Sequence, residues 1–567
     1  MTRAPAFKSW LDNFFAAYCR RLPVNATFIG IHNYDDRLPD YSPDAVGGAL
    51  DDVNALLERL RTLPDEQLTA AEMLDRKLAE GFLEIQRWEV QSGHFQSGNP
   101  CLYTSETAFG VISLLRRPFA PAGQRLEAAI RRMEAVPNLL QQGRANVRTA
   151  PHWWTERAID ECAGALALFD AGIHEFMRER GISEPLVDRA AARARTAVAE
   201  FQHYLETDLR ANSTEGCACG AEAFALLLRK GHFVETGAAD IERYALEQLA
   251  GCEAFLTSHA GDFGARTWQE ALAQLACLHP SADRYYSRYS ELWQDCRSLA
   301  EQNHLLTWPD CPIRYVPRPR WAREAAPHLY FLFYHSPAPF DALPDHEYLV
   351  TPIDATMPPD MQEQLLRATN DSVIKLNHVV HHGAIGHHVQ NRHAFRAESL
   401  VGRIAAVDCA SRIALFCGGT MAEGWACYAT DLMDEFGFLT PLEHYSQIHA
   451  RMRMAARAVV DVRLHHGRIT LEQAAAFYRD RVGMTAAAAR SEAVKNSMFP
   501  GAALMYLAGT DAIHGLRHEL ERRPGFRLSS FHDRLLSFGS APVALAAESM
   551  KNVIAETQSE QRRQKEI

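Results

Sequence analysis

Apolar residues recur at intervals of three and four along most of this chain. This spacing places the apolar side chains on one face of an α-helix, where they can pack against a core. The clearest examples are residues 43–62, 122–144, 156–178 and 186–209. Few stretches alternate apolar and polar residues as strands do. We therefore predict a mostly α fold.

Two short segments depart from the helical pattern. Residues 330–334 and 348–351 are dense in aromatic and β-branched side chains, and prolines lie near their ends. Such segments are typical of strands. We predict a small accessory β element beside the helices.

The chain is long enough for one large core. It has 567 residues, of which 47% are hydrophobic, and its breaks at residues 96–100, 212–220 and 309–320 are too short to be flexible linkers. We expect a single large helical domain over residues 1–567. Within it we expect a helical N-terminal lobe at about residues 1–345 and a lobe with a metal site at about residues 346–567.

Charge and hydropathy exclude two classes of partner. The net charge is −11, and the only basic run is a short tail around Arg562, Arg563 and Lys565, which argues against binding nucleic acid. No segment approaches the ~18 apolar residues of a membrane span, and the first residues lack the apolar stretch of a secretion signal. We therefore expect a cytoplasmic protein without a membrane partner, and the oligomeric state stays open.

A dense histidine cluster is the strongest chemical signal. Five histidines fall within eleven residues: His378, His381, His382, His387 and His388. On a continuous α-helix His378, His381 and His388 would share one face. His382 would flank that face, and His387 would point away. Asn370 or Asp371 can cap such a helix at its start.

Two glycines interrupt this cluster. Gly383 and Gly386 favour a bend, which can bring His387 rather than His388 into the group. Neutral imidazole is the commonest protein ligand of zinc, and a catalytic zinc site usually has three protein ligands and one position for water. Two of these histidines together with Glu423 would complete such a set.

The surrounding motifs identify a family resemblance. Residues 381–390 read HHGAIGHHVQ and residues 423–428 read EGWACY. They resemble the pattern H-E-x-x-P-G-H-H-x-Q followed by E-G-W-A-x-Y, found in helical proteins catalogued as domain of unknown function 885 and proposed to be zinc metallopeptidases. Further matches extend over most of the chain. The resemblance implies a large helical metallopeptidase-like fold, with His381, either His387 or His388, and Glu423 as metal ligands.

The chain departs from that pattern near the site. His382 stands where zinc peptidases use a glutamate to take a proton from water. Thr430 replaces an acidic residue and Ile385 replaces proline. His382 can itself accept a proton near neutral pH, or it can become a ligand in a site that suits iron, manganese or copper as well as zinc. The position of His378 one helical turn earlier slightly favours ligation or support of a ligand.

We expect one divalent metal, zinc foremost with iron or manganese as alternatives. The expected activity is hydrolysis of a small peptide or of an amide-containing small molecule. Two alternatives stay open, namely a metal-dependent oxygenase or lyase with a rebuilt site, and a metal-binding pseudopeptidase without activity.

Other residues give weaker signals. Tyr506 resembles a family tyrosine and can donate a hydrogen bond to an oxyanion, although it can equally be a core residue. Asp461 and His465 lie one helical turn apart and can orient a ligand histidine, as can His378. Arg517 can pair with a substrate carboxylate, although a structural ion pair is the simpler alternative.

Overall fold

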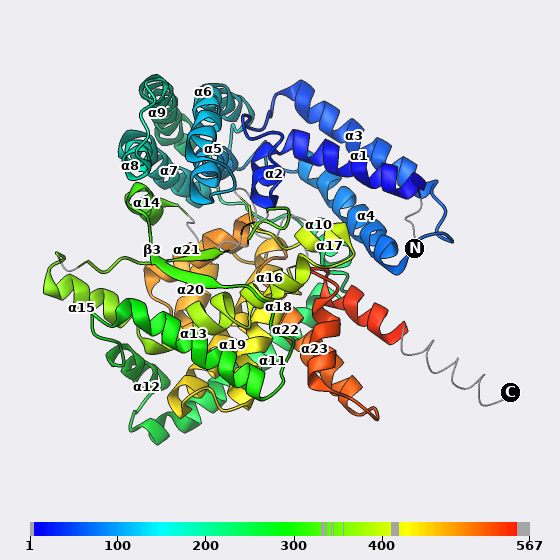
Figure 1. Cartoon of the computed structure of the whole chain (residues 1–567), viewed down its shortest axis with the longest axis vertical. Coiled ribbons are helices and arrows are strands. Elements are labelled where there is room, and N and C mark those ends of the chain that lie inside the picture. The colour runs from blue at the N-terminus through cyan, green and yellow to red at the C-terminus, as the bar shows by residue number, and fades with distance from the viewer. Residues whose placement is uncertain are drawn as a thin grey trace.

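The computed structural model describes residues 5–329, 334, 337–341, 343, 345–354, 356–409 and 419–552. Helices dominate these residues (Figure 1). Two pairs of short parallel strands accompany them: β1 (Ala150–Pro151) with β2 (Ser213–Thr214), and β3 (Ile313–Pro317) with β4 (His346–Val350). The predicted mostly α fold with a small β element is confirmed.

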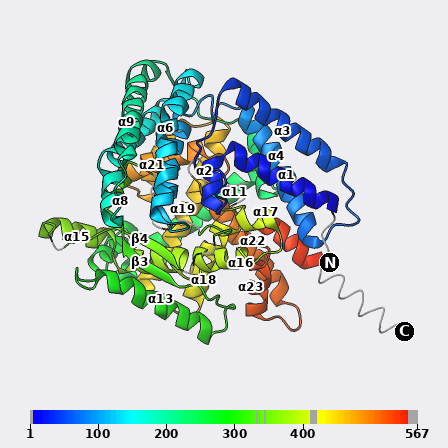
Figure 2. The same ribbon diagram turned by 45° about the horizontal axis from the view of Figure 1, so that its top comes forward.

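The first four helices form one corner of the molecule, coloured blue in Figures 1 and 2. They are α1 (Pro5–Arg21), α2 (Pro23–Ile29), α3 (Pro43–Arg61) and α4 (Ala70–Gln91). Helix α3 matches the helix predicted at residues 43–62. The Ser42 hydroxyl accepts the Ala45 N–H at its start, and its buried residues, among them Val53 and Leu57, share one face.

The next helices lie beside one another next to that corner (Figure 1). They are α5 (Pro100–Arg116), α6 (Ala122–Asn146), α7 (His152–Ala167), α8 (Ile173–Arg180) and α9 (Leu186–Tyr204), with π-helical turns η1 (Leu168–Gly172) and η2 (Leu205–Leu209). The helix predicted at residues 122–144 is confirmed, and the one predicted at residues 186–209 is helical throughout, with its last five residues in the π-helical turn η2. The one predicted at residues 156–178 is helical throughout, but η1 divides it into α7 and α8.

The middle of the chain contributes mainly short helices. They are α10 (Ala221–Leu226), η3 (Leu227–His232), α11 (Ala238–His259), η4 (Ala260–Phe263), α12 (Trp268–Ala273), η5 (Gln274–Cys277), α13 (Tyr285–Gln302), α14 (Arg320–Arg323) and η6 (Ala326–His328). Helix α11 packs along the long helix α19 (Pro441–His465).

The remaining helices include the two that carry the histidine cluster. They are α15 (Pro359–Ala368), η7 (Val373–Gly383), α16 (His387–Ala394), α17 (Leu400–Ile404), α18 (Ala422–Glu435), α20 (Leu471–Val482), α21 (Ala486–Met498), α22 (Met505–Glu521) and α23 (Leu528–Leu536). Helices η7 and α16 carry the cluster, and α18 packs against both. Helices α18 and α22 approach closely at Gly424 and Gly509. A Cβ on Gly424 would lie 2.5 Å from the Gly509 carbonyl carbon, so the glycine of the EGWA motif permits this packing.

One apolar core joins the early and late parts of the chain. Val24 of α2, Phe201 of α9 and Val459 of α19 belong to the same buried cluster. Between α7 and α21, the Trp154 indole N–H donates to the Ser497 hydroxyl at 2.8 Å. The division into lobes near residue 345 stays a prediction. Among the helices of the described residues, none combines the length and apolar character needed to cross a bilayer.

The structure describes only one of the two predicted strands in full. Strand β4 confirms the segment at residues 348–351, and it pairs with β3 so that Tyr348 lies opposite Tyr315. Of the other segment, residues 330–333 lie outside the described part, and Tyr334 belongs to no strand. Strand β4 contacts the histidine cluster, because the Tyr348 hydroxyl lies 2.7 Å from His378 Nδ1. The small β element therefore lies beside the cluster, as predicted.

Candidate metal centre

The segment with the first three histidines is a π-helix. Element η7 has eleven residues, and the Asn370 side-chain oxygen accepts the Val373 N–H at its start, as predicted for a cap. The predicted α-helical stripe is wrong, because a π-helix hydrogen-bonds five residues apart rather than four. His381 and His382 consequently both line a cleft, while His378 does not. π-Helical turns are frequent at functional sites.

A tight turn separates η7 from α16. Two indole N–H groups hold it: Trp293 donates to the Gly383 carbonyl at 2.9 Å and Trp425 to the Ile385 carbonyl at 2.8 Å. A Cβ on Gly386 would lie 1.9 Å from the carbonyl oxygen of His381. The bend expected from the glycines is therefore present, and only glycine fits its last position.

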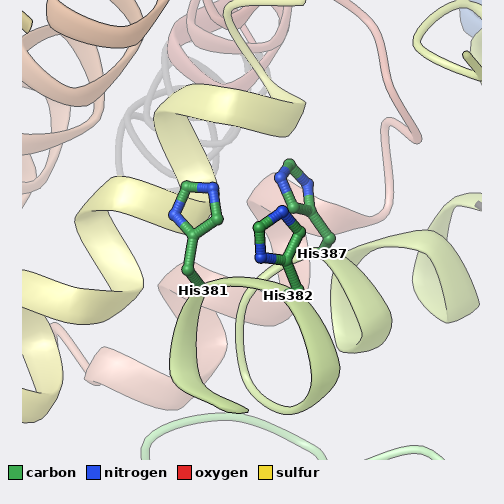
Figure 3. A group of neighbouring side chains, drawn as sticks. All are labelled: His381, His382 and His387. Atoms are coloured by element: carbon green, nitrogen blue, oxygen red, sulfur yellow. The ribbon is translucent and has the colours of Figure 1, made fainter. Parts of the chain in front are cut away.

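The turn brings His387 to the other two imidazoles. His381, His382 and His387 each offer a nitrogen that lies within 4.8 Å of the others. Figure 3 shows the three rings extending to the same side of the ribbon. Since His382 Nδ1 lies 2.7 Å from the Asn377 carbonyl, it carries the proton, and Nε2 of the neutral ring carries the lone pair.

Glu423 completes the group from the first turn of α18. Its Oε2 lies 3.4 Å from His381 Nε2 and 3.5 Å from His387 Nε2. This oxygen is buried and has no partner in hydrogen-bonding geometry within the described part of the chain. Two ligands that are each ~2.1 Å from a tetrahedral ion are about 3.4 Å apart. The spacing and chemistry of these three atoms fit a divalent metal.

The charge states also suit a metal. Burial lowers the pKa of His381 and that of His382. Burial alone would raise the pKa of Glu423, but the neighbouring imidazoles of His387 and His381 hold it well below 4.5. Neutral imidazoles and an ionised carboxylate are the forms that bind metal ions.

His378 and His388 lie outside this group. His388 Nε2 lies 3.0 Å from the Cys311 carbonyl, and its Nδ1 lies 3.4 Å from the Tyr334 hydroxyl. Burial lowers the pKa of His388 to about 3 and that of His378 to about 4. Both histidines are buried in the core, behind the other three. Of His387 and His388, it is His387 that lies beside Glu423.

A cleft of about 610 Å³ opens in front of the group. Among the residues that line it are His381, His382, Glu423, Thr430 and Tyr506. The Tyr506 ring lies 4.5 Å from the guanidinium carbon of Arg457. Burial, reinforced by Glu423, raises the pKa of Tyr506 well above 10, so its hydroxyl keeps its proton at neutral pH and can donate it in a hydrogen bond.

Asp461 and His465 are placed away from the three imidazoles. The Asp461 carboxylate accepts the backbone N–H groups of Gly501 and Leu504, both at 3.0 Å. His465 Nε2 lies 3.0 Å from the Asn496 carbonyl. Both side chains are fully buried. Asp461 holds the loop that leads into Tyr506, and neither residue contacts a histidine of the cluster.

Arg517 is committed to an ion pair. Its two terminal nitrogens each donate to the Glu435 carboxylate at 2.7 Å, and it is absent from the residues that line the cleft. Of the two arginines of α19 that do line it beside His381 and Glu423, Arg457 pairs with Glu492, whereas Arg453 has no ion pair with a described residue. The helical repeat Ser446, Ala450, Arg453 and Arg457 is the only sequence signal for it.

Two solved structures share the fold of this chain. One is a candidate lipoprotein of unknown function from Shewanella oneidensis, with 22% identity, a TM-score of 0.77, and coverage of 96% of this chain and 100% of that one. The other is a candidate lipoprotein from Colwellia psychrerythraea, with 17% identity, a TM-score of 0.77, and coverage of 97% and 99%. No functionally curated protein matches the chain.

These neighbours overturn one prediction. Both are described as candidate lipoproteins, and lipoproteins are held at a membrane by attached lipid, so the expected cytoplasmic location is contradicted. The hydropathy of a sequence reveals apolar segments of the chain itself, whereas a lipid anchor adds its apolar surface as acyl groups.

The family suggested by the two motifs is shown by a match over nearly the whole chain. The family described as "Bacterial protein of unknown function (DUF885)" matches residues 23–550. The match includes η7, the turn after it, and Glu423. The protein therefore belongs to the DUF885 family.

Proposed function

We propose that this protein is a metal-dependent hydrolase of peptide or related amide bonds. The observation that carries the proposal is Oε2 of Glu423 lying 3.4 and 3.5 Å from Nε2 of His381 and His387, at the wall of an open cleft. Two imidazoles and one carboxylate leave a coordination position for water. Zinc fits best, and iron or manganese fits the same donors.

A bound zinc ion would supply a Lewis acid that polarises the scissile carbonyl and acidifies a water molecule. His382 stands beside the three proposed ligands with its Nδ1 proton directed to the Asn377 carbonyl. Its Nε2 is therefore placed to accept a proton during attack of water on the amide. The same nitrogen can then return the proton to the leaving amine.

Tyr506 is the proposed partner of the developing negative charge. Its side chain shares the cleft with His381 and Glu423, and burial keeps the hydroxyl protonated. A donor preorganised toward an oxyanion contributes about 3–4 kcal/mol to lowering a barrier. Arg457 over its ring fixes the position of the tyrosine.

The test combines elemental analysis of the purified protein with turnover of a peptide library. We expect about one zinc per chain, and loss of most of it in His381→Ala, His387→Ala and Glu423→Ala without loss of helical circular dichroism. His393→Ala is the matched control, because that imidazole of α16 faces the Thr307 carbonyl. Full metal content in all three variants, or no hydrolysis by the zinc-loaded protein, would contradict the proposal.

A second candidate rests on the third imidazole. His382 also offers a nitrogen within 4.8 Å of His381 and His387, so a histidine-rich site can support a metal-dependent oxygenase or lyase. Iron or copper in the protein as purified, with oxygen consumption in place of amide hydrolysis, would favour this candidate. Bound metal without turnover of any kind would indicate a pseudopeptidase.

A further inference from the structure

Helix α19 presents an arginine to the cleft without a protein partner. Arg453 is an exposed residue that lines the cleft, and it makes no hydrogen bond or ion pair with any described residue. Its neighbours on the same helix are all paired: Arg451 with Asp511, Arg457 with Glu492, and Arg463 with Glu242. Arginines of α19 thus have acidic partners as a rule, and Arg453 is the exception.

The nearby acidic groups are already engaged. Glu492 accepts two hydrogen bonds from Arg457, at 2.7 and 3.1 Å, and lies 3.2 Å from Lys495. Among the described residues that line the cleft, Glu423 is the only carboxylate, and it faces the histidines. The guanidinium of Arg453 is therefore available to an anionic group of a molecule that enters the cleft.

Other parts of the cleft wall are apolar. Leu272, Leu275, Val373 and Leu376 also line it and offer apolar surface. A molecule that fills this space meets an apolar wall, a proposed metal site and one unpaired guanidinium. Arg453 and His381 line the same cleft, so one molecule bound there can contact both.

We propose that Arg453 binds the free C-terminal carboxylate of a peptide substrate, whose apolar side chains contact the leucine-lined wall. A planar guanidinium pairs with a carboxylate through two parallel hydrogen bonds. The proposal rests on the function proposed above and selects its substrates: peptides cleaved near their C-terminus. Water supplies the hydroxyl for the acyl carbon and the proton for the amine, so no further reactant is needed.

The test measures binding separately from turnover. Two ketomethylene pseudopeptides that cannot be hydrolysed, identical except for a C-terminal carboxylate or carboxamide, are titrated into the full-length protein by calorimetry. We expect the carboxylate to bind about 10- to 100-fold more tightly, the range of a charge-assisted hydrogen bond. Arg453→Gln should abolish this preference, and Arg453→Lys should keep part of it.

Arg479→Gln is the control, because it removes an exposed arginine of α20 paired with Asp480. It should leave the preference unchanged. Equal binding of both pseudopeptides, binding of neither, or a preference that survives Arg453→Gln would overturn the proposal. Inorganic phosphate that competes as strongly as acetate would point to a general anion site and would also overturn it.

Turnover separates this proposal from the preceding one. Hydrolysis of free and amidated peptides at equal rates would contradict the role of Arg453 while leaving the hydrolase standing. A carboxylate preference in binding that depends on Arg453, without any hydrolysis, would contradict the hydrolase while leaving the binding site standing.

Discussion

His382 is the residue whose chemistry decides most about this site. Its Nδ1 proton is directed to the Asn377 carbonyl, which leaves the lone pair on Nε2, and a nitrogen of the ring lies within 4.8 Å of His381 and His387. A ligand and a proton acceptor both need that lone pair. The two roles differ in what is lost when the ring is removed.

Because His382 is proposed to accept the proton, the His382→Ala variant is expected to retain bound metal and to hydrolyse peptides more slowly. Loss of a general base lowers turnover by ~10²–10⁴-fold, whereas loss of a ligand would weaken metal affinity by orders of magnitude. Elemental analysis, chelator competition and rate measurements distinguish the two outcomes. His382→Glu, which restores the family's carboxylate, should preserve or raise hydrolysis. A metal-free His382→Ala protein would show that His382 is a ligand.

At the scale of single residues, the sequence predicts only part of this site. Motif spacing and family resemblance single out His381 and Glu423, which the fold brings to 3.4 Å, and their role as ligands stays a prediction. The sequence points to Arg517 rather than to Arg453. Which arginine is unpaired depends on partners such as Glu435 and Glu492, and only the folded chain reveals these.

At the scale of elements, the site depends on how η7 ends. The α-helical period misplaced the imidazoles, because a π-helix adds residues to each turn. The glycines correctly indicated a bend. The indoles that fix its shape come from α13 and α18, and no local pattern identifies them. Helix positions were thus predictable from periodicity, and the conformation of this one helix was not.

Gly386→Ala should disrupt the metal site while sparing the fold. The added Cβ would lie 1.9 Å from the His381 carbonyl oxygen, so the turn must shift and carry His387 with it. We expect metal affinity to fall at least about tenfold, as for disturbed support of a ligand, with little change in circular dichroism. Gly515→Ala in α22, where a Cβ meets nothing within 4 Å, is the control. Unchanged affinity in Gly386→Ala would count against this role of the turn.

At the scale of the whole molecule, a charged network joins distant parts of the chain. His32, just after α2, lies 2.8 Å from Asp35 and 2.8 Å from Asp341. Its ring also stacks on Phe119 at 3.8 Å. Burial alone would lower the pKa of His32, but the hydrogen bonds that the ring donates to the Asp341 and Asp35 carboxylates outweigh it and raise the pKa to about 9.

This shift predicts how stability depends on pH. The folded protein binds the His32 proton more tightly than the unfolded chain, whose histidines titrate near pH 6.5. The stabilisation of the folded protein by protonated His32 is therefore complete below pH 6.5 and disappears as pH rises through 9. His32→Gln should lower the free energy of unfolding by about 3 kcal/mol at most near pH 6. The difference from the unsubstituted protein should shrink by pH 10.

Urea unfolding at several pH values measures that difference, with the exposed His203→Gln as control. A gap that is constant or grows above pH 8 would show that His32 acts without its charge. On this scale the sequence predicted the mostly α class correctly, because periodicity extends over whole helices. The predicted cytoplasmic location is contradicted by the candidate lipoproteins that share the fold, and hydropathy does not test for lipid attachment.

The two indoles that hold the turn have a practical consequence. Trp293 and Trp425 are 7% and 0% exposed, and each donates its ring proton to the segment that carries His387. The emission wavelength of tryptophan responds to hydrogen bonding and to water at the ring nitrogen. Any movement of the segment when the histidines are occupied or emptied therefore alters intrinsic fluorescence, and the protein carries a built-in optical reporter beside its own candidate reaction centre.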